Sequence, residues 1–158
     1  MKQIFNYESA YAGPAIPTLN LKLLFGDNIY PEVLTGLIDT GSDTSSIPID
    51  ILHSIQAKRT DSMNISTIIG TQIPVDLYLV AVQIGEHRIY GIEVVGNKQT
   101  DEIIIGRDIL NQLIVELNGL AQVTTISDRV YWPFHTGSRF SANARGTSSA
   151  SSEANILS

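Results

Sequence analysis

An aspartate directly follows an apolar run at residues 37–42, whose sequence is LIDTGS. The next two residues, Thr40 and Gly41, form a pair that ends helices, so the run predicts a buried strand with the Asp39 carboxylate at its tip. Glycine would let the backbone turn sharply beneath that carboxylate, because it has no Cβ to block a close approach. Aspartate is also a common turn former in β proteins, so the stretch alone leaves a functional and a structural interpretation open.

The rest of the chain is divided into short segments typical of strands. Alternation of apolar and polar residues, together with runs rich in β-branched residues, predicts strands at 18–25, 33–38, 75–84, 88–95, 103–105, 114–117 and 121–126. Short helices are expected near 49–55 and 107–113. The pattern predicts an all-β fold with one or two short helices, closed into a β-barrel or sandwich.

The length of 158 residues suits one domain of ordinary size with flanking segments. Residues 1–17, which contain prolines and small residues, are predicted to be an extended N-terminal arm, and residues 18–133 the domain itself. Residues 134–158 are rich in Ser, Ala and Gly. Such a segment cannot bury enough apolar surface to offset its ordering entropy, so a disordered tail is expected.

Composition excludes several classes of function. A net charge of −6 argues against a nucleic-acid partner, and no apolar run approaches the roughly 20 residues of a membrane helix. The chain has no cysteine and three scattered histidines, so neither a disulfide, a structural metal site nor a cofactor is predicted. The first residues do not resemble a secretory signal, and a cytoplasmic location is expected.

Two later segments add to the Asp39 motif. Residues 66–74 have two β-prone arms around Gly70, which predicts a hairpin. Residues 104–110, with the sequence IIGRDIL, form an apolar strand closed by Gly106. In this order the three segments resemble the retropepsin group of aspartic proteases, the single-domain, retroviral-type members. The resemblance covers roughly residues 18–119.

The resemblance implies an aspartic endopeptidase in which Asp39 is catalytic. Peptide hydrolysis by activated water needs a base and an acid, and two adjacent carboxyl groups that share a proton supply both. This chain has one Asp-Thr-Gly sequence, so the resemblance implies a C2 homodimer that contributes Asp39 from each subunit and binds an extended polypeptide. Thr40 would join the two loops, Gly41 would let the backbone lie close to the carboxylates, and Ser42 would donate a hydrogen bond to the pair.

The same resemblance assigns supporting roles. Asp43 is expected to pair with Arg107, and Ile105 and Gly106 to form the support strand behind Asp39. The residues Ile68, Ile69, Gly70 and Thr71 would form the tip of a flap that closes over substrate. Viral relatives have several glycines around this tip, whereas this chain has one, which leaves the flap boundaries open.

The dimer contact stays open at this point. Viral relatives join their subunits through interleaved terminal strands, but about 40 residues follow the strand at 114–117 here. Either the arm at 1–10 or the strand near Val123 could replace that contact. Two other functions also remain: a catalytically silent module of the same fold that dimerises or binds peptides, and a small β-barrel binding protein whose motif arose by chance.

Overall fold

The computed structural model describes residues 2–10, 12–66 and 70–127. Two short helices interrupt the strands, α1 (Ile49–Ser54) and α2 (Arg107–Leu110). The strands are β1 (Lys2–Asn6), β2 (Thr18–Phe25), β3 (Asn28–Ile29), β4 (Leu34–Ile38), β5 (Ser46–Pro48), β6 (Lys58–Ser66), β7 (Gln72–Ile84), β8 (His87–Asn97), β9 (Ile103–Ile105), β10 (Ile114–Asn118) and β11 (Val123–Ser127).

Most of the strands form one sheet that closes on itself. Its order is β3-β2-β4-β9-β5-β8-β7-β6, and an additional pairing of β2 with β7 completes a six-strand barrel. Strand β2 has room for both neighbours because its first half pairs with β4, and Lys22 to Leu24 pair with β7. The predicted all-β fold with two short helices and a closed barrel is confirmed.

Alternation along the strands places the apolar side chains inside the barrel. In β2, Leu19, Leu21 and Leu23 are fully buried, while the intervening Asn20 and Lys22 are exposed. The short strand β9 lies beside β4 in parallel, and its Ile105 is also fully buried. The core therefore lies directly behind the end of β4, where Asp39 follows.

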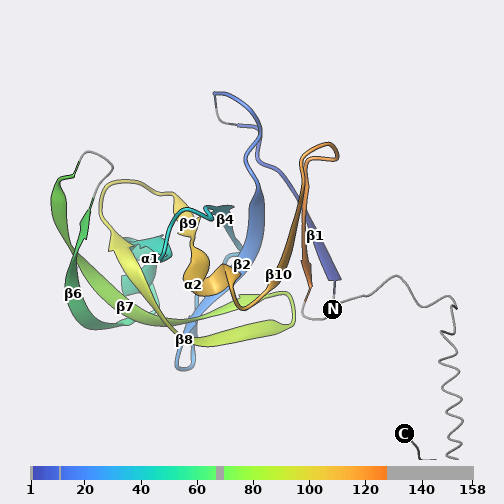
Figure 1. Cartoon of the computed structure of the whole chain (residues 1–158). Coiled ribbons are helices and arrows are strands. Elements are labelled where there is room, and N and C mark those ends of the chain that lie inside the picture. Colours follow the sequence, from blue (N-terminus) through green and yellow to red (C-terminus); the bar gives the residue numbers. More distant parts are fainter. Residues whose placement is uncertain (1, 11, 67–69, 128–158) are drawn as a thin grey trace, which may run out of the picture.

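A second sheet lies beside the barrel and has the order β1-β11-β10 (Figure 1). Strand β1 pairs with β11 from Lys2 opposite Ser127 to Asn6 opposite Val123, and β11 pairs in turn with β10. The segment predicted to be an extended arm therefore contributes a strand. The end of the predicted domain, residues 128–133, and the predicted tail at 134–158 lie outside the described residues.

The β6–β7 hairpin lies on the opposite side of the barrel from this sheet (Figure 1). Strand β6 pairs with β7 along its whole length, whereas β8 begins to pair with β7 only at Leu77. Residues 72–76 of β7 therefore pair with β6 but not with β8. Within the part of the chain that is described, no helix has the length and apolar character to cross a membrane.

Candidate functional site

The loop after β4 holds Asp39 at the end of the buried strand. The Asp39 backbone N–H donates to Ile105 O at 3.0 Å, which extends the parallel β4–β9 pairing by one step. The Asp39 side chain is exposed, and its Oδ1 accepts the Gly41 N–H at 2.9 Å. A Cβ at Gly41 would lie 3.2 Å from the same oxygen, so glycine allows the turn to lie close to the carboxylate. The carboxylate is thus presented to solvent from a rigid strand end.

Thr40 and Ser42 flank the glycine in this turn. Thr40 is exposed, and the Ser42 N–H donates to Asp39 O at 3.2 Å. The Ser42 hydroxyl donates to Thr44 O at 2.8 Å. The expected hydrogen bond from Ser42 to the carboxylate pair concerns two subunits and stays a prediction; to form it, the hydroxyl would have to turn away from Thr44 O, because a hydroxyl has one proton to donate. In the single chain the hydroxyl makes a short local bond to a carbonyl two residues along the chain.

The Asp39 loop is joined to the start of α2 by backbone hydrogen bonds. Arg107 N–H donates to Ser42 O at 2.9 Å, and Asp108 N–H donates to Asp43 O at 3.2 Å. The side chains of Asp43 and Arg107 form an ion pair, so the structure brings together the two residues that the resemblance linked. Their side chains are 81% and 50% exposed, and a pair so exposed contributes at most about 1 kcal/mol. The backbone bonds are therefore the main connection.

A buried polar network behind this loop was missed in the sequence. Ser45, which is fully buried, donates from its N–H to Asp108 Oδ2 at 2.9 Å and from its hydroxyl to Oδ1 at 2.6 Å. The Ser45 hydroxyl oxygen also accepts the Gly106 N–H at 2.9 Å. Asp108 Oδ1 further accepts the Ile109 N–H at 2.9 Å at the start of α2. These bonds fasten the loop after Asp39 to the segment after β9, and they give Asp108 a structural role.

The second predicted element, the flap, is only partly described. Ile68 and Ile69 lie outside the described residues, whereas Gly70 and Thr71 are exposed at the end of the β6–β7 hairpin. Gly70 has a φ of 81°, a left-handed conformation that favours glycine. An isolated two-stranded hairpin is marginally stable in water, so the part of the hairpin beyond the barrel needs support at its base.

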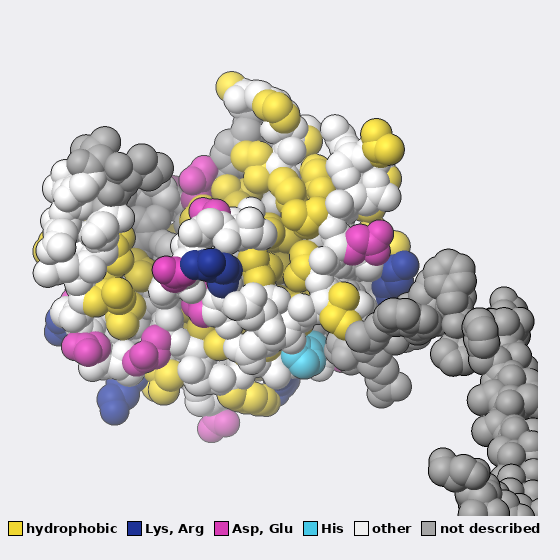
Figure 2. Space-filling view, in the orientation of Figure 1, with side chains coloured by type: hydrophobic (Ala, Val, Ile, Leu, Met, Phe, Trp, Pro, Cys, Tyr) yellow, Lys and Arg dark blue, Asp and Glu magenta, His cyan; other side chains and the backbone are white. Residues whose placement is uncertain are grey.

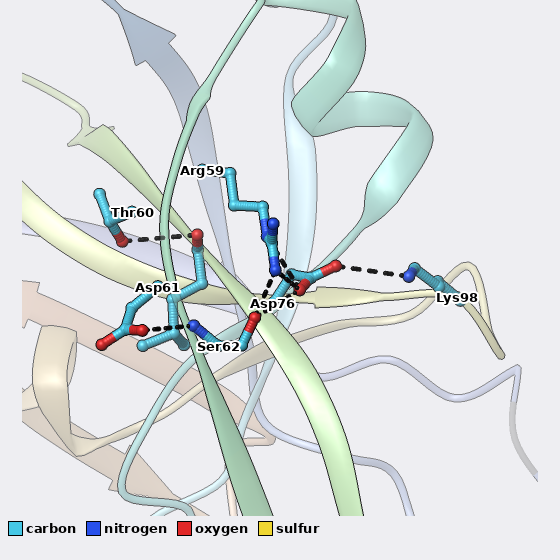
Figure 3. Close-up of polar contacts among 7 residues, drawn as sticks. Arg59, Thr60, Asp61, Ser62, Asp76 and Lys98 are labelled. Atoms are coloured by element: carbon cyan, nitrogen blue, oxygen red, sulfur yellow. Dashed lines mark hydrogen bonds and ion pairs between the residues drawn. The ribbon is translucent and has the colours of Figure 1, made fainter.

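Asp76 supplies contacts at that base (Figure 3). It is the last residue of β7 before β8 begins to pair, and its carboxylate accepts from Ser62 Oγ at 2.9 Å and Arg59 Nε at 2.9 Å. Lys98, which follows β8, approaches the other oxygen at 3.5 Å. The hydrogen bond from Ser62, with the hydrogen bond and charge of Arg59, lowers the pKa of the Asp76 carboxyl. We name Asp76, Arg59, Ser62 and Lys98 the hairpin-base cluster.

The hairpin-base cluster predicts a specific pH dependence of stability. A carboxyl group whose pKa is lowered on folding stabilises the native state above its unfolded pKa, and this contribution is lost as pH falls through the folded pKa. Asp76→Asn is therefore expected to lower the Tm at pH 7, and the difference from wild type should shrink below about pH 4. Thermal unfolding of both proteins between pH 2 and 7 measures this difference.

Asp61→Asn is the matched control, because Asp61 lies on β6, the strand that also holds Arg59 and Ser62, and its carboxylate accepts the backbone N–H of its neighbour Ser62. Its effect on the Tm should be smaller at pH 7. A Tm difference between Asp76→Asn and wild type that stays constant over the whole pH range would contradict the electrostatic role of Asp76.

A groove of about 430 Å³ lies between this hairpin and the segment after β8. The hairpin side carries the apolar side chains of Ile65, Ile73 and Val75 and, at its base, Asp76, while Ser46 of β5 lies at the barrel side. Asn97, Lys98 and Gln99 make the opposite wall polar. The groove suits an extended chain with an apolar side chain directed toward the hairpin.

The described acidic and histidine side chains near Asp39 are not arranged as metal ligands. Among residues 2–10, 12–66 and 70–127, no group of three His, Asp or Glu side chains converges as a metal site would require. The acids nearest Asp39 in the loop network are already engaged, Asp43 with Arg107 and Asp108 with Ser45. Asp39, at the end of β4, is therefore the exposed carboxylate of this loop that no described side chain engages.

Comparisons with known proteins identify the family and the fold. Residues 28–109 match the family described as Aspartyl protease. The fold is similar to the crystal structure of a retropepsin-like aspartic protease from Rickettsia conorii, with a TM-score of 0.52 and 11% identity over 80% of this chain and 91% of that chain. EIAV protease complexed with the inhibitor HBY-793 aligns at a TM-score of 0.48 and 21% identity, over 65% of this chain and 92% of that chain. No curated protein matches the sequence.

Proposed function

The chain belongs to the aspartyl protease family and has a retropepsin-like fold, and we propose that it is an endopeptidase whose active site combines Asp39 from two subunits. The observation that carries the proposal is the exposed Asp39 carboxylate at the end of β4, which no described side chain engages. Because the neighbouring Asp43 and Asp108 are held by other partners, a second copy of Asp39 is the source of the second carboxyl group. A twofold axis beside the Asp39 turn brings the two together.

Two carboxyl groups at contact distance share one proton, because both cannot ionise side by side. The ionised group takes a proton from a water molecule held between them, and the water oxygen attacks the peptide carbonyl carbon. The protonated group stabilises the developing oxyanion, and a proton is then delivered to the leaving nitrogen. The pair titrates as one unit, so neither apparent pKa belongs to one subunit. Both acid and base are carboxyl groups, and the reaction requires no cofactor.

The turn supports this chemistry through its backbone. The Gly41 N–H, which donates to Asp39 Oδ1 at 2.9 Å, fixes the plane of the carboxyl group. Thr40 is exposed beside it, in a position from which its hydroxyl can contact the loop of the second subunit. Fixed donors of this kind stabilise charge without reorganising during the reaction.

The substrate is an extended polypeptide that lies between the Asp39 turns and the β6–β7 hairpin. Main-chain hydrogen bonds hold such a chain in the manner of an added strand, and side-chain pockets select among sequences. The groove of about 430 Å³ beside the hairpin receives an apolar side chain. The hairpin acts as the flap, and the left-handed backbone at Gly70 allows a tight turn near its tip.

Dilution tests the shared active site. If one site needs two subunits, then well below the dimer dissociation constant a tenfold dilution lowers the cleavage rate per subunit by about tenfold. The rate is measured on a library of unfolded polypeptides between pH 3 and 7, with new amino termini identified by mass spectrometry, and sedimentation gives the dissociation constant. A rate per subunit that stays constant across dissociation would contradict the proposal. A stable dimer without cleavage would point to a silent peptide-binding module.

A further inference from the structure

A groove of about 390 Å³ lies between strand β1 and the barrel. Among the described strands, the order of the second sheet is β1-β11-β10, so β1 has β11 on one side and no strand on the other. Three consecutive residues of β1, Gln3 to Phe5, line the groove. Successive side chains of a strand point to opposite faces, so a groove that meets three residues in a row runs along the free edge of the strand. Such an edge presents N–H and C=O groups that can pair with a further segment.

The walls of this groove are held in place by contacts of the described chain. On the barrel side it is lined by Lys22 of β2 and Gln83 of β7, which pair with each other. The Gln3 side chain lies so close to the turn between β7 and β8 that a Cβ at Gly85 would collide with it. These contacts hold β1 against the barrel, so the groove is formed before anything enters it.

The groove carries apolar side chains that the described residues leave in contact with water. Val33, just before β4, is 58% exposed, Ile4 is 61% exposed, and Phe5 is half-buried. Among the described residues that line the groove, only Lys22 is charged. A lining of this kind suits an apolar segment with few charges.

The chain leaves the second sheet beside this groove. Strand β11 ends at Ser127, which lies opposite Lys2 of β1, and the groove begins at the next residue of β1. To reach the free edge of β1 the chain has to pass around that strand, a distance of two strand spacings or about 10 Å. Three extended residues span about 10 Å. Residues from 130 onward can therefore reach the groove, and the charged Asp128 and Arg129 fall in the crossing, where they stay in water.

Residues 130–134, with the sequence VYWPF, are the most apolar stretch of the chain beyond Ser127. They contain three of the four Phe, Tyr and Trp residues that follow Ser127. Trp132 precedes a proline, and a residue in that position favours an extended backbone. In an extended segment Val130, Trp132 and Phe134 share one face. The segment therefore offers an apolar face to the groove that it can reach.

A second apolar surface lies farther from Ser127. Figure 2 shows hydrophobic side chains gathered between β2 and the β10–β11 hairpin. The turn of that hairpin holds the fully exposed Leu120 and lies at the opposite end of β11 from Ser127. A strand of five residues is about 17 Å long, so the chain that leaves Ser127 starts beside the β1 groove and away from this turn.

We propose that residues 130–134 of this chain dock in the groove between β1 and the barrel, with Trp132 and Phe134 directed toward Phe5 and Val33. The residues before Pro133 pair with the free edge of β1 as an added strand, and Pro133, which has no N–H to donate, ends the pairing. Docking covers the apolar side chains of both surfaces and gives β1 a partner on its second side. This contact is independent of the proposed peptide cleavage.

Tryptophan fluorescence of the full chain tests this contact, because Trp132 is the only tryptophan. Its emission in the native chain should lie to the blue of the emission in the urea-unfolded chain, because docking removes the indole from water. Val33→Lys places a charge in the groove and should shift the emission to the red, toward the unfolded value. Its far-UV circular dichroism should stay near native because Val33 is exposed.

Ile29→Lys is the matched control, because Ile29 is 52% exposed and is not among the residues that line the groove. It should leave the emission of Trp132 unchanged. A native wild-type emission equal to that of the unfolded chain would overturn the inference, and so would equal red shifts in Val33→Lys and Ile29→Lys.

A spin label locates the indole on the surface. The native chain has no cysteine, so each single-cysteine variant carries one nitroxide, which quenches the fluorescence of a tryptophan that it contacts. A nitroxide on Val33→Cys should remove most of the Trp132 emission, whereas one on Leu120→Cys should remove little. The same variants with a diamagnetic label correct for the modification itself. Stronger quenching from Leu120→Cys would place the segment on the second apolar surface and contradict the proposal.

A mixing experiment identifies which copy supplies the segment. Spin-labelled Val33→Cys that also carries Trp132→Phe is mixed with unlabelled wild type, so that nitroxide and indole are on different chains. After subunit exchange the wild-type emission should remain unquenched. Quenching as strong as in the labelled Val33→Cys single variant would mean that the groove holds the segment of a second copy, which would reject docking within one chain.

Discussion

Asp39→Asn is expected to lower kcat/KM for polypeptide cleavage by about 10³-fold to 10⁴-fold, the range associated with loss of general acid–base catalysis. The substitution removes the group that shares the proton, in both subunits at once. It leaves the loop intact, because an asparagine Oδ1 can still accept the Gly41 N–H that Asp39 Oδ1 accepts at 2.9 Å. The fold and the dimer should therefore persist while cleavage is lost.

The measurement compares cleavage of the unfolded-polypeptide library by wild type and variant, with sedimentation and thermal unfolding of each. Asp27→Asn, in the exposed turn after β2, is the control for loss of one negative charge and should cleave at the wild-type rate. After subunit exchange in an equal mixture of wild type and Asp39→Asn, about a quarter of the dimers retain two Asp39 side chains. Equal cleavage by wild type and Asp39→Asn would refute the catalytic role.

Gly106→Ala is expected to lower the free energy of unfolding by about 2 to 3 kcal/mol, the upper part of the range for overpacking. A Cβ at Gly106 would lie 2.8 Å from the backbone carbon of Thr44 and 3.0 Å from the carbonyl oxygen of Ser42. These are backbone atoms, so no side-chain rotation relieves the contact. The displaced segment is the one that carries Asp39, so cleavage should fall together with stability.

Gly119→Ala is the matched control for this prediction. Gly119 lies in the turn between β10 and β11, and a Cβ there has nothing within 4 Å. Urea unfolding of the two variants and wild type gives the comparison, and Gly119→Ala should stay within about 0.5 kcal/mol of wild type. A similarly small change in Gly106→Ala would show that the loop yields easily and that glycine is not required.

The sequence was most informative where burial was strongest. Strand β2 alternates buried and exposed residues at Thr18–Leu23, and β9 is continuously apolar, so both were predicted from periodicity. Strand β6 was missed because nearly all of its residues are exposed on both faces, which leaves no alternation to detect. Strand β6 forms because its backbone pairs with β7 along the whole length of β6.

Asp39 could be predicted as a site residue from its neighbours in the sequence, whereas the long-range hydrogen bonds of the site could not. Asp39 was found because a buried strand precedes it and a glycine follows it. The bonds from Ser45 to Asp108 and from Asp76 to Arg59 join residues distant in sequence. No local pattern distinguishes these serines and acids from ordinary surface residues. The hydrogen bond from the Ser42 hydroxyl to Thr44 O was not predicted, because only the folded loop brings that carbonyl near.

The pairing of β1 with β11 has a consequence for how the chain is made. Lys2 lies opposite Ser127, the longest-range strand pairing among the described residues, and closing a loop of this length costs about 4 kcal/mol of chain entropy. Synthesis delivers β1 first and β11 after every other described strand, so the small sheet can be completed only when the barrel residues have already been made. An unfinished chain lacks β11, the central strand that pairs with both β1 and β10. Strand β1 therefore has no β11 to pair with until translation has passed residue 127.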